Sequence, residues 1–156
     1  MIIKTIKIKN REINPVIKTL TYEMPFKDSR IKNRIIDTLI KEYDKYEKNR
    51  IDIVTKFADK DESGKFISVD SIDEKGNIKK IYSFSDENLE SFNKEYEILV
   101  NEEVCIDMTP SVQTYFVRLK EFIENSPVKI SISESFHVEN FLEELDKETE
   151  KVAKKK

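Results

Sequence analysis

The segment from Asp59 to Asp70 has the residue types and spacing of a calcium-binding loop. Its candidate ligands are Asp59, Asp61, Ser63 and Asp70, at loop positions 1, 3, 5 and 12, and Gly64 stands at position 6. A twelve-residue calcium loop needs oxygens at these positions and a glycine at the sharp bend. Asp70 is shorter than the glutamate that usually ends such a loop, and residues 71–77 lack the apolar spacing of an exit helix. We therefore favour the alternative, a solvated turn between a helix and a strand in which Gly64 ends the helix.

The remaining side chains that could do chemistry are few. The chain has one histidine, His137, and one cysteine, Cys105, among 156 residues. Cys105 lies between Val104 and Ile106, a setting typical of a buried structural thiol rather than a nucleophile. His137 has no pattern of cysteine or carboxylate at ligand spacing around it. We expect no enzymatic activity, no cofactor and, apart from the calcium alternative, no metal.

Glutamates between residues 90 and 103 offer one further possibility. Glu95 and Glu102 are seven residues apart, so on one helix they would share a face and could form a carboxylate pair. Charged residues make up 38% of the chain, however, and such spacings then arise by chance. A solvated helix face is the simpler interpretation.

Composition and charge limit the classes of partner. The net charge is −3, and lysines alternate with glutamates and aspartates, so no basic face for nucleic acid is expected. No apolar run approaches the roughly 20 residues of a membrane span, and Lys4 interrupts the apolar start, which argues against a secretory signal. The single cysteine fits a reducing cytoplasm.

The first half of the chain predicts a strand and two helices. Alternation over Ile2–Lys9 indicates an amphipathic strand. Asn14-Pro15 is typical of a helix start, and Pro25 would end that helix. From Asp28 or Ser29, apolar residues recur every three or four positions for about 28 residues, which predicts a helix of roughly 40 Å. Its apolar positions are Ile31, Ile35, Leu39, Tyr43, Tyr46, Ile53 or Val54, and Phe57.

The second half predicts a hairpin, helices and a late strand. Residues 66–72 and 78–84 are expected to form a β-hairpin around a turn containing Gly76, and Ser85 to cap the next helix. Thr109-Pro110 is expected to open a helix, residues 127–133 to form a strand, and Ser135 to cap a last helix. The fold class is therefore α+β, with one small, mostly antiparallel sheet packed against the long helix and several shorter ones. We expect one domain over residues 1–146 and a frayed, lysine-rich tail over residues 147–156.

Three segments and four residues of the long helix resemble a known family. The segments are FADKDESG at 57–64, FNKEY at 92–96 and NEEV at 101–104, and the helix residues are Arg34, Leu39, Tyr46 and Arg50. In these positions the chain resembles a family of uncharacterised small proteins encoded by tailed phages and prophages of low-GC Gram-positive bacteria. The resemblance implies a phage origin and the host cytoplasm, and it implies no catalytic residues.

A protein of this kind is expected to act by binding. Our leading hypothesis is a non-enzymatic factor that binds a host or phage protein and modulates a host process, such as host defence. The candidate interaction residues are Tyr43, Tyr46 and Arg50 on the long helix. One alternative is an accessory factor of virion assembly that forms a homo-oligomer through that helix. A lower-ranked alternative is sequestration of a small ligand or nucleotide, which predicts a pocket lined by tyrosine and arginine.

Overall fold

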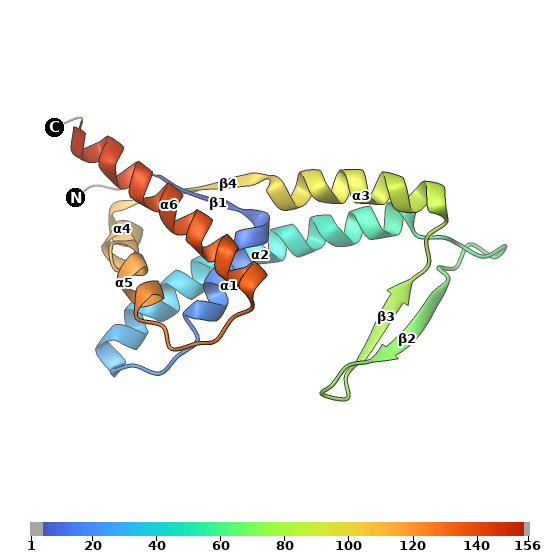
Figure 1. Ribbon diagram of the computed structural model, residues 1–156, viewed down its shortest axis with the longest axis horizontal. Helices are drawn as coiled ribbons and strands as arrows, with labels where there is room; N and C mark the ends of the chain where they lie inside the picture. Colours follow the sequence, from blue (N-terminus) through green and yellow to red (C-terminus); the bar gives the residue numbers. More distant parts are fainter. Residues whose placement is uncertain (1–4, 155–156) are drawn as a thin grey trace. The chain divides into compact units, whose positions relative to one another are not determined.

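The computed structural model describes residues 5–154, with side chains up to residue 148, and the chain divides into two compact units (Figure 1). Unit 1 comprises residues 1–45 and 100–156, and unit 2 comprises residues 46–99. The elements are β1 (Thr5–Lys9), α1 (Asn10–Thr19), α2 (Phe26–Phe57), β2 (Ser68–Ile72), β3 (Ile78–Tyr82), α3 (Asp86–Asn101), β4 (Glu103–Asp107), α4 (Pro110–Phe116), α5 (Leu119–Glu124) and α6 (Ile132–Lys154). The α+β class is confirmed. The single domain expected for residues 1–146 stays a prediction, and most of the expected tail falls outside the described side chains.

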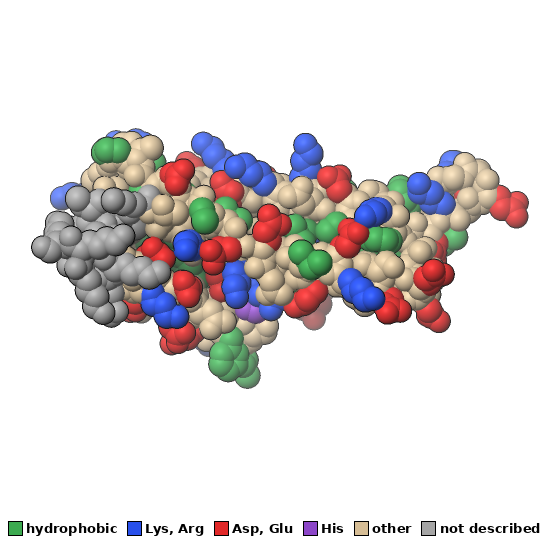
Figure 2. All heavy atoms as spheres, turned by 90° about the horizontal axis from the view of Figure 1, so that it is seen from above, with side chains coloured by type: hydrophobic (Ala, Val, Ile, Leu, Met, Phe, Trp, Pro, Cys, Tyr) green, Lys and Arg blue, Asp and Glu red, His purple; other side chains and the backbone are tan. Residues whose placement is uncertain are grey.

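The strands form two separate antiparallel pairs instead of the single sheet that we expected. β1 pairs with β4, and β2 pairs with β3 in the predicted hairpin. Acidic and basic side chains are interspersed over the surface seen in Figure 2. Within the described part of the chain, no helix combines the length and the apolar character that a bilayer span requires.

The β1–β4 pair supplies one wall of the core of unit 1. Ile6 and Ile8 are each 1% exposed, and they face Ile106 and Val104 across the ladder. β4 was not anticipated, and it corrects the expectation of a buried Cys105. Successive side chains of a strand point to opposite faces. Because Val104 and Ile106 turn toward the core, Cys105 turns away from it and is exposed. Residues 2–4 of the predicted first strand lie outside the described residues.

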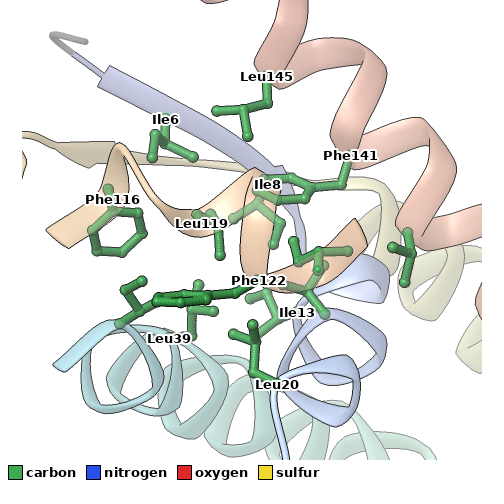
Figure 3. Packing of buried hydrophobic residues seen from close by; sticks show 14 of the residues in the cluster. Ile6, Ile8, Ile13, Leu20, Leu39, Phe116, Leu119, Phe122, Phe141 and Leu145 are labelled. Carbon is green, nitrogen blue, oxygen red and sulfur yellow. The ribbon is translucent and has the colours of Figure 1, made fainter. Parts of the chain in front are cut away.

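The core brings together side chains from both sequence segments of unit 1. Figure 3 shows Ile6 and Ile8 of β1 near Phe141 of α6, with Phe122 of α5 between them and Leu39 of α2. The buried set is Ile6, Ile8, Ile13, Val16, Leu20, Ile35, Leu39, Ile106, Phe116, Leu119, Phe122, Ile123, Val138, Phe141 and Leu145. The helical spacing of Ile35 and Leu39 therefore predicted the buried face of α2 correctly.

α1 begins at Asn10, directly after β1, and not at Asn14-Pro15. The side chain of Glu12 fixes this start, because its Oε1 accepts a hydrogen bond from the Lys9 N–H at 2.9 Å. The Asn10 N–H donates to the Glu102 carbonyl at 3.1 Å, so the strand ladder continues into the helix start. Pro15 lies inside the helix.

Of the two other helix starts predicted in this part of unit 1, the start at Thr109-Pro110 is confirmed, with Thr109 as the cap of α4, whereas the start of the long helix shifts. α2 begins at Phe26, because the N–H groups of Asp28 and Ser29 already donate to the Pro25 carbonyl at 3.0 and 2.9 Å. The helix expected from Pro110 divides into α4 and α5 near Arg118, whose guanidinium binds Asp28 at 2.6 Å.

The late strand predicted at residues 127–133 is wrong. Residues 127–131 have no regular structure, and α6 begins at Ile132, ahead of the start expected from a Ser135 cap. Ser131 and Glu134 form a reciprocal cap: the Ser131 N–H donates to Glu134 Oε1, and the Glu134 N–H donates to Ser131 Oγ, each at 3.1 Å. A serine followed three residues later by glutamate is a helix-start signal, and here it prevails over the alternation.

Replacement of Phe141 by alanine tests the core of unit 1. Phe141 is 0% exposed, so Phe141→Ala leaves a cavity and is expected to lower the free energy of unfolding by about 3–5 kcal/mol. The matched control is Phe136→Ala on the same helix, where the ring is 64% exposed and the expected change is below about 0.5 kcal/mol. Urea unfolding measures both values, and equal losses would contradict this assignment of the core.

Replacement of Glu12 tests the start of α1. Burial raises the pKa of Glu12 above its usual value of 4.5, although the Lys9 N–H opposes the shift. A raised folded-state pKa favours the neutral acid, so the stability it contributes is complete below that usual value and is lost as pH rises. Glu12→Gln keeps the oxygen acceptor and removes the buried charge. We expect this variant to gain stability relative to the wild type between acid and neutral pH.

The control for this experiment is Glu12→Ala, which removes the acceptor. It is expected to cost about 1 kcal/mol at neutral pH. A Glu12→Gln variant as unstable as Glu12→Ala at neutral pH would show that the carboxylate charge, and not the acceptor, maintains the helix start.

Candidate functional site

The candidate calcium ligands do not converge. Asp61 Oδ1 accepts hydrogen bonds from the Ser63 N–H at 2.9 Å, the Ser63 hydroxyl at 2.6 Å and the Lys65 N–H at 3.0 Å. These bonds, above all that from the Ser63 hydroxyl, lower the pKa of Asp61. Asp59 Oδ1 accepts from the Asn88 side-chain amide at 3.1 Å, and Asp70 lies on β2 opposite Lys80. Across residues 5–148, no three acidic, cysteine or histidine side chains group as metal ligands would.

The loop instead has the geometry of a tight turn, but Gly64 does not end the long helix as we expected, because α2 already ends at Phe57. The Gly64 N–H donates to the Asp61 carbonyl at 3.0 Å, and Gly64 has φ +85°, a conformation that glycine adopts without strain. Lys60 and Phe66 then form an antiparallel bridge. Gly64, which stands at the position where calcium loops require a glycine, here provides the positive φ of the turn.

The three candidate interaction residues are divided between the two units, with Tyr43 in unit 1 and Tyr46 and Arg50 in unit 2. Tyr43 is a residue of unit 1 and is half-buried against its core. Tyr46 belongs to unit 2 and is 8% exposed, with its hydroxyl 3.4 Å from that of Tyr96. Burial, followed by the hydrogen bond to Tyr96, raises the pKa of Tyr46. Arg50 Nε and Nη2 donate to the carboxylate of Glu47 at 3.0 and 2.9 Å. Tyr46 therefore presents little of its ring to a partner.

An aromatic stack extends this packing within unit 2. The Phe92 and Tyr96 rings are stacked with centroids 5.4 Å apart, and Phe84 lies 4.9 Å from Phe92. Lys56 Nζ contacts Glu95 Oε1 at 2.6 Å. These contacts join residues 46–57 of α2 to α3, and they place the tyrosines of unit 2 in a packing role.

The remaining sequence candidates belong to different elements: Glu95 to α3, Cys105 to β4 and His137 to α6. α3 ends at Asn101, so Glu102 does not share a helix face with Glu95, and that possible carboxylate pair is corrected. His137 is half-buried on α6, whereas Cys105 is exposed on β4.

The β2–β3 hairpin carries apolar side chains that the structure leaves open. Val69 and Ile81 are 65% and 55% exposed, and Ile72 and Ile78 are each 72% exposed. Each of these pairs is in register across the hairpin, and the two pairs lie on opposite faces because their positions differ by an odd number of residues. We call Val69, Ile72, Ile78 and Ile81 the hairpin surface.

Both ends of the hairpin are well defined. At the tip, Asp73 Oδ1 accepts from the N–H groups of Lys75 and Asn77 at 2.9 and 2.8 Å. At the base, the Phe66 and Tyr82 rings meet edge to face with centroids 5.7 Å apart. Sequence analysis predicted the hairpin but not its exposure, because apolar residues in strands are equally typical of a covered sheet. The lysines and acidic residues beside these apolar residues were the sequence signal that could have indicated an exposed hairpin.

Calcium addition tests the interpretation of the Asp59–Asp70 loop. Even weak calcium loops bind the ion at about 10⁻³ M, so millimolar calcium is a sufficient test. We expect it to leave the melting temperature unchanged, because Asp61 Oδ1 already accepts three hydrogen bonds within the turn. The measurement is differential scanning calorimetry with and without calcium. A saturable rise in melting temperature that Asp61→Asn abolishes, but Glu74→Gln in the hairpin turn does not, would overturn the turn interpretation.

The chain matches a protein family of unknown function. A family model described as "Protein of unknown function (DUF1617)" matches residues 4–152, which is nearly the whole chain. No curated protein and no solved structure matches. The chain therefore belongs to the DUF1617 family of proteins of unknown function.

Proposed function

We propose that this chain is a phage-encoded, non-enzymatic binding protein that occupies another protein in the cytoplasm of the infected host and so modulates a host process. The observation that carries the proposal is the hairpin surface of unit 2, where four large aliphatic side chains are more than half exposed. Inhibition of a host defence is one form of this activity.

The hairpin surface offers enough binding energy to act as an anchor. Complete burial of an aliphatic side chain of this size is worth about 1.5–3 kcal/mol. A two-stranded hairpin is also marginally stable by itself, so contact with a partner would stabilise the hairpin as well. Because the two exposed apolar pairs lie on opposite faces, a partner has to enclose the hairpin to cover both of them.

The charges between the apolar pairs favour a protein over a lipid surface. Asp70 and Lys80 are opposite each other in the register, and Ser71 is opposite Lys79. A partner that covered the hairpin would have to satisfy these polar groups with hydrogen bonds or opposite charges, which lipid tails do not provide. A protein with a matching apolar cleft and a polar rim meets both demands.

The phage origin rests on sequence. The segments at 57–64, 92–96 and 101–104 that resemble proteins of tailed phages all lie within the residues that the family model matches. Virion assembly by self-association is the competing function, and it predicts a homo-oligomer.

Site-specific photo-crosslinking tests the proposal. A photoreactive amino acid at position 78, in cells that express the whole chain during phage infection, is expected to give one dominant adduct with a protein of the cell. The matched control is position 98 on α3, where Ile98 is 71% exposed but lies outside the hairpin surface. Mass spectrometry identifies the adduct.

The purified partner then allows a quantitative test. We expect the double variant Ile72→Ser/Ile78→Ser to bind it at least about tenfold more weakly, since each lost contact is worth on the order of 1 kcal/mol. Ile98→Ser should bind as the wild type does. Equal crosslinking from both positions, or a large homo-oligomer in sedimentation velocity that the double variant dissolves, would contradict the proposal and favour assembly.

A further inference from the structure

Unit 1 contains an open hollow lined by cationic and aromatic side chains. Its volume is about 320 Å³, and it is lined by Phe26, Lys27, Arg30, Ile31, Arg34 and Tyr115. Most of these residues lie on the first turns of α2, and Tyr115 comes from α4. The volume falls at the lower end of the range of small-ligand sites, about 300–1,000 Å³.

The three cations of the hollow share one face of α2. Lys27, Arg30 and Arg34 are three and four residues apart, which places them within about 11 Å along the helix. Among the described residues, none of the three makes an ion pair, and the adjacent carboxylate of Asp28 is taken by Arg118 at 2.6 Å. Like charges at this spacing repel one another, so an anion with several charges would relieve the repulsion.

Aromatic rings hold and flank these cations. The Arg34 guanidinium carbon lies 5.1 Å from the centroid of the Tyr115 ring, which orients this guanidinium. Arg30 lies 6.0 Å from the centroid of Phe26, and Phe26 is 79% exposed. Guanidinium groups bind phosphate in a two-pronged geometry, and an open aromatic ring is a platform on which a base can stack.

We propose that this hollow binds a free nucleotide, with the phosphates on Lys27, Arg30 and Arg34 and the base on Phe26. The lining includes the tyrosine and arginines expected for the lower-ranked alternative, sequestration of a nucleotide. A free nucleotide is favoured over a nucleic-acid strand because the three cations extend only about 11 Å along α2, while acidic and basic side chains are interspersed over the surface seen in Figure 2. All its residues belong to unit 1, whereas the hairpin surface belongs to unit 2, so the two binding activities are separable.

Isothermal titration calorimetry of the whole chain with ATP, with inorganic triphosphate and with a ten-residue oligothymidylate tests this proposal. ATP and inorganic triphosphate are both expected to bind the wild type. Arg30→Gln and Arg34→Gln should each weaken both ligands at least tenfold. The matched control is Lys41→Gln, which removes one positive charge from an exposed position of α2 outside the hollow. Lys41 lies about two turns beyond Arg34, where salt screens its charge, so this variant should change affinity less than twofold.

Phe26 provides the test of base recognition. Phe26→Ala should weaken ATP at least threefold and leave inorganic triphosphate unchanged, whereas Phe136→Ala, at another exposed ring of unit 1, should change neither. Circular dichroism verifies that each variant is folded.

Three results would overturn the proposal: no heat with ATP at millimolar concentration, equal losses for Lys41→Gln and Arg34→Gln, or tighter binding of the oligothymidylate than of ATP. The third result would assign the hollow to single-stranded nucleic acid. Ile72→Ser/Ile78→Ser should bind ATP as the wild type does, so failure here and failure of the hairpin proposal can be told apart.

Discussion

Burial of Ile6 and Ile8 between the β1–β4 pair and the helices of unit 1 is the constraint on which the rest of the structure depends. β1 lies at the start of the chain and β4 far along it, yet the five residues of each strand pair in register. Closing so long a loop costs conformational entropy, which the apolar contacts of the shared core must offset. Once the pair is formed, the chain leaves unit 1 after residue 45 and returns to it at residue 100.

This constraint explains which sequence patterns predicted structure well. The spacing of Ile35 and Leu39 predicted the buried face of α2, and the turn around Gly76 predicted the hairpin. Both patterns depend only on residues that are close in the sequence. β4 was missed because a five-residue strand that directly follows a helix has no signal until its partner is known. Cys105 illustrates the consequence: its apolar neighbours suggested burial, but alternation in the unexpected strand turns it outward.

Capping groups account for other differences between sequence and structure. Glu12 moves the start of α1 ahead of Pro15, and Ser131 with Glu134 begins α6 where alternation indicated a strand.

The candidate site was harder to predict than the fold. Tyr46 was expected to face a partner, but an apolar position on a helix does not reveal whether a second element covers it, and here Tyr96 lies beside it. The exposure of the hairpin surface likewise depends on whether another element packs against it, which the sequence of the hairpin does not reveal.

The two proposed activities rest on different chemistry. The hairpin surface of unit 2 combines apolar pairs with scattered charges, which suits a protein surface, whereas the hollow of unit 1 combines cations with open aromatic rings, which suits a phosphate-bearing ligand. Both proposals assign this protein a role in binding other molecules.

Oxidative footprinting of the whole chain, purified and inside phage-infected cells, examines the central claim most directly. The account predicts that side chains at 69, 72, 78 and 81 are modified readily in the purified chain and are protected in the cell, while Phe136 of α6 is modified equally in both. Equal modification of the hairpin in both settings would show that no partner covers it and would contradict the account.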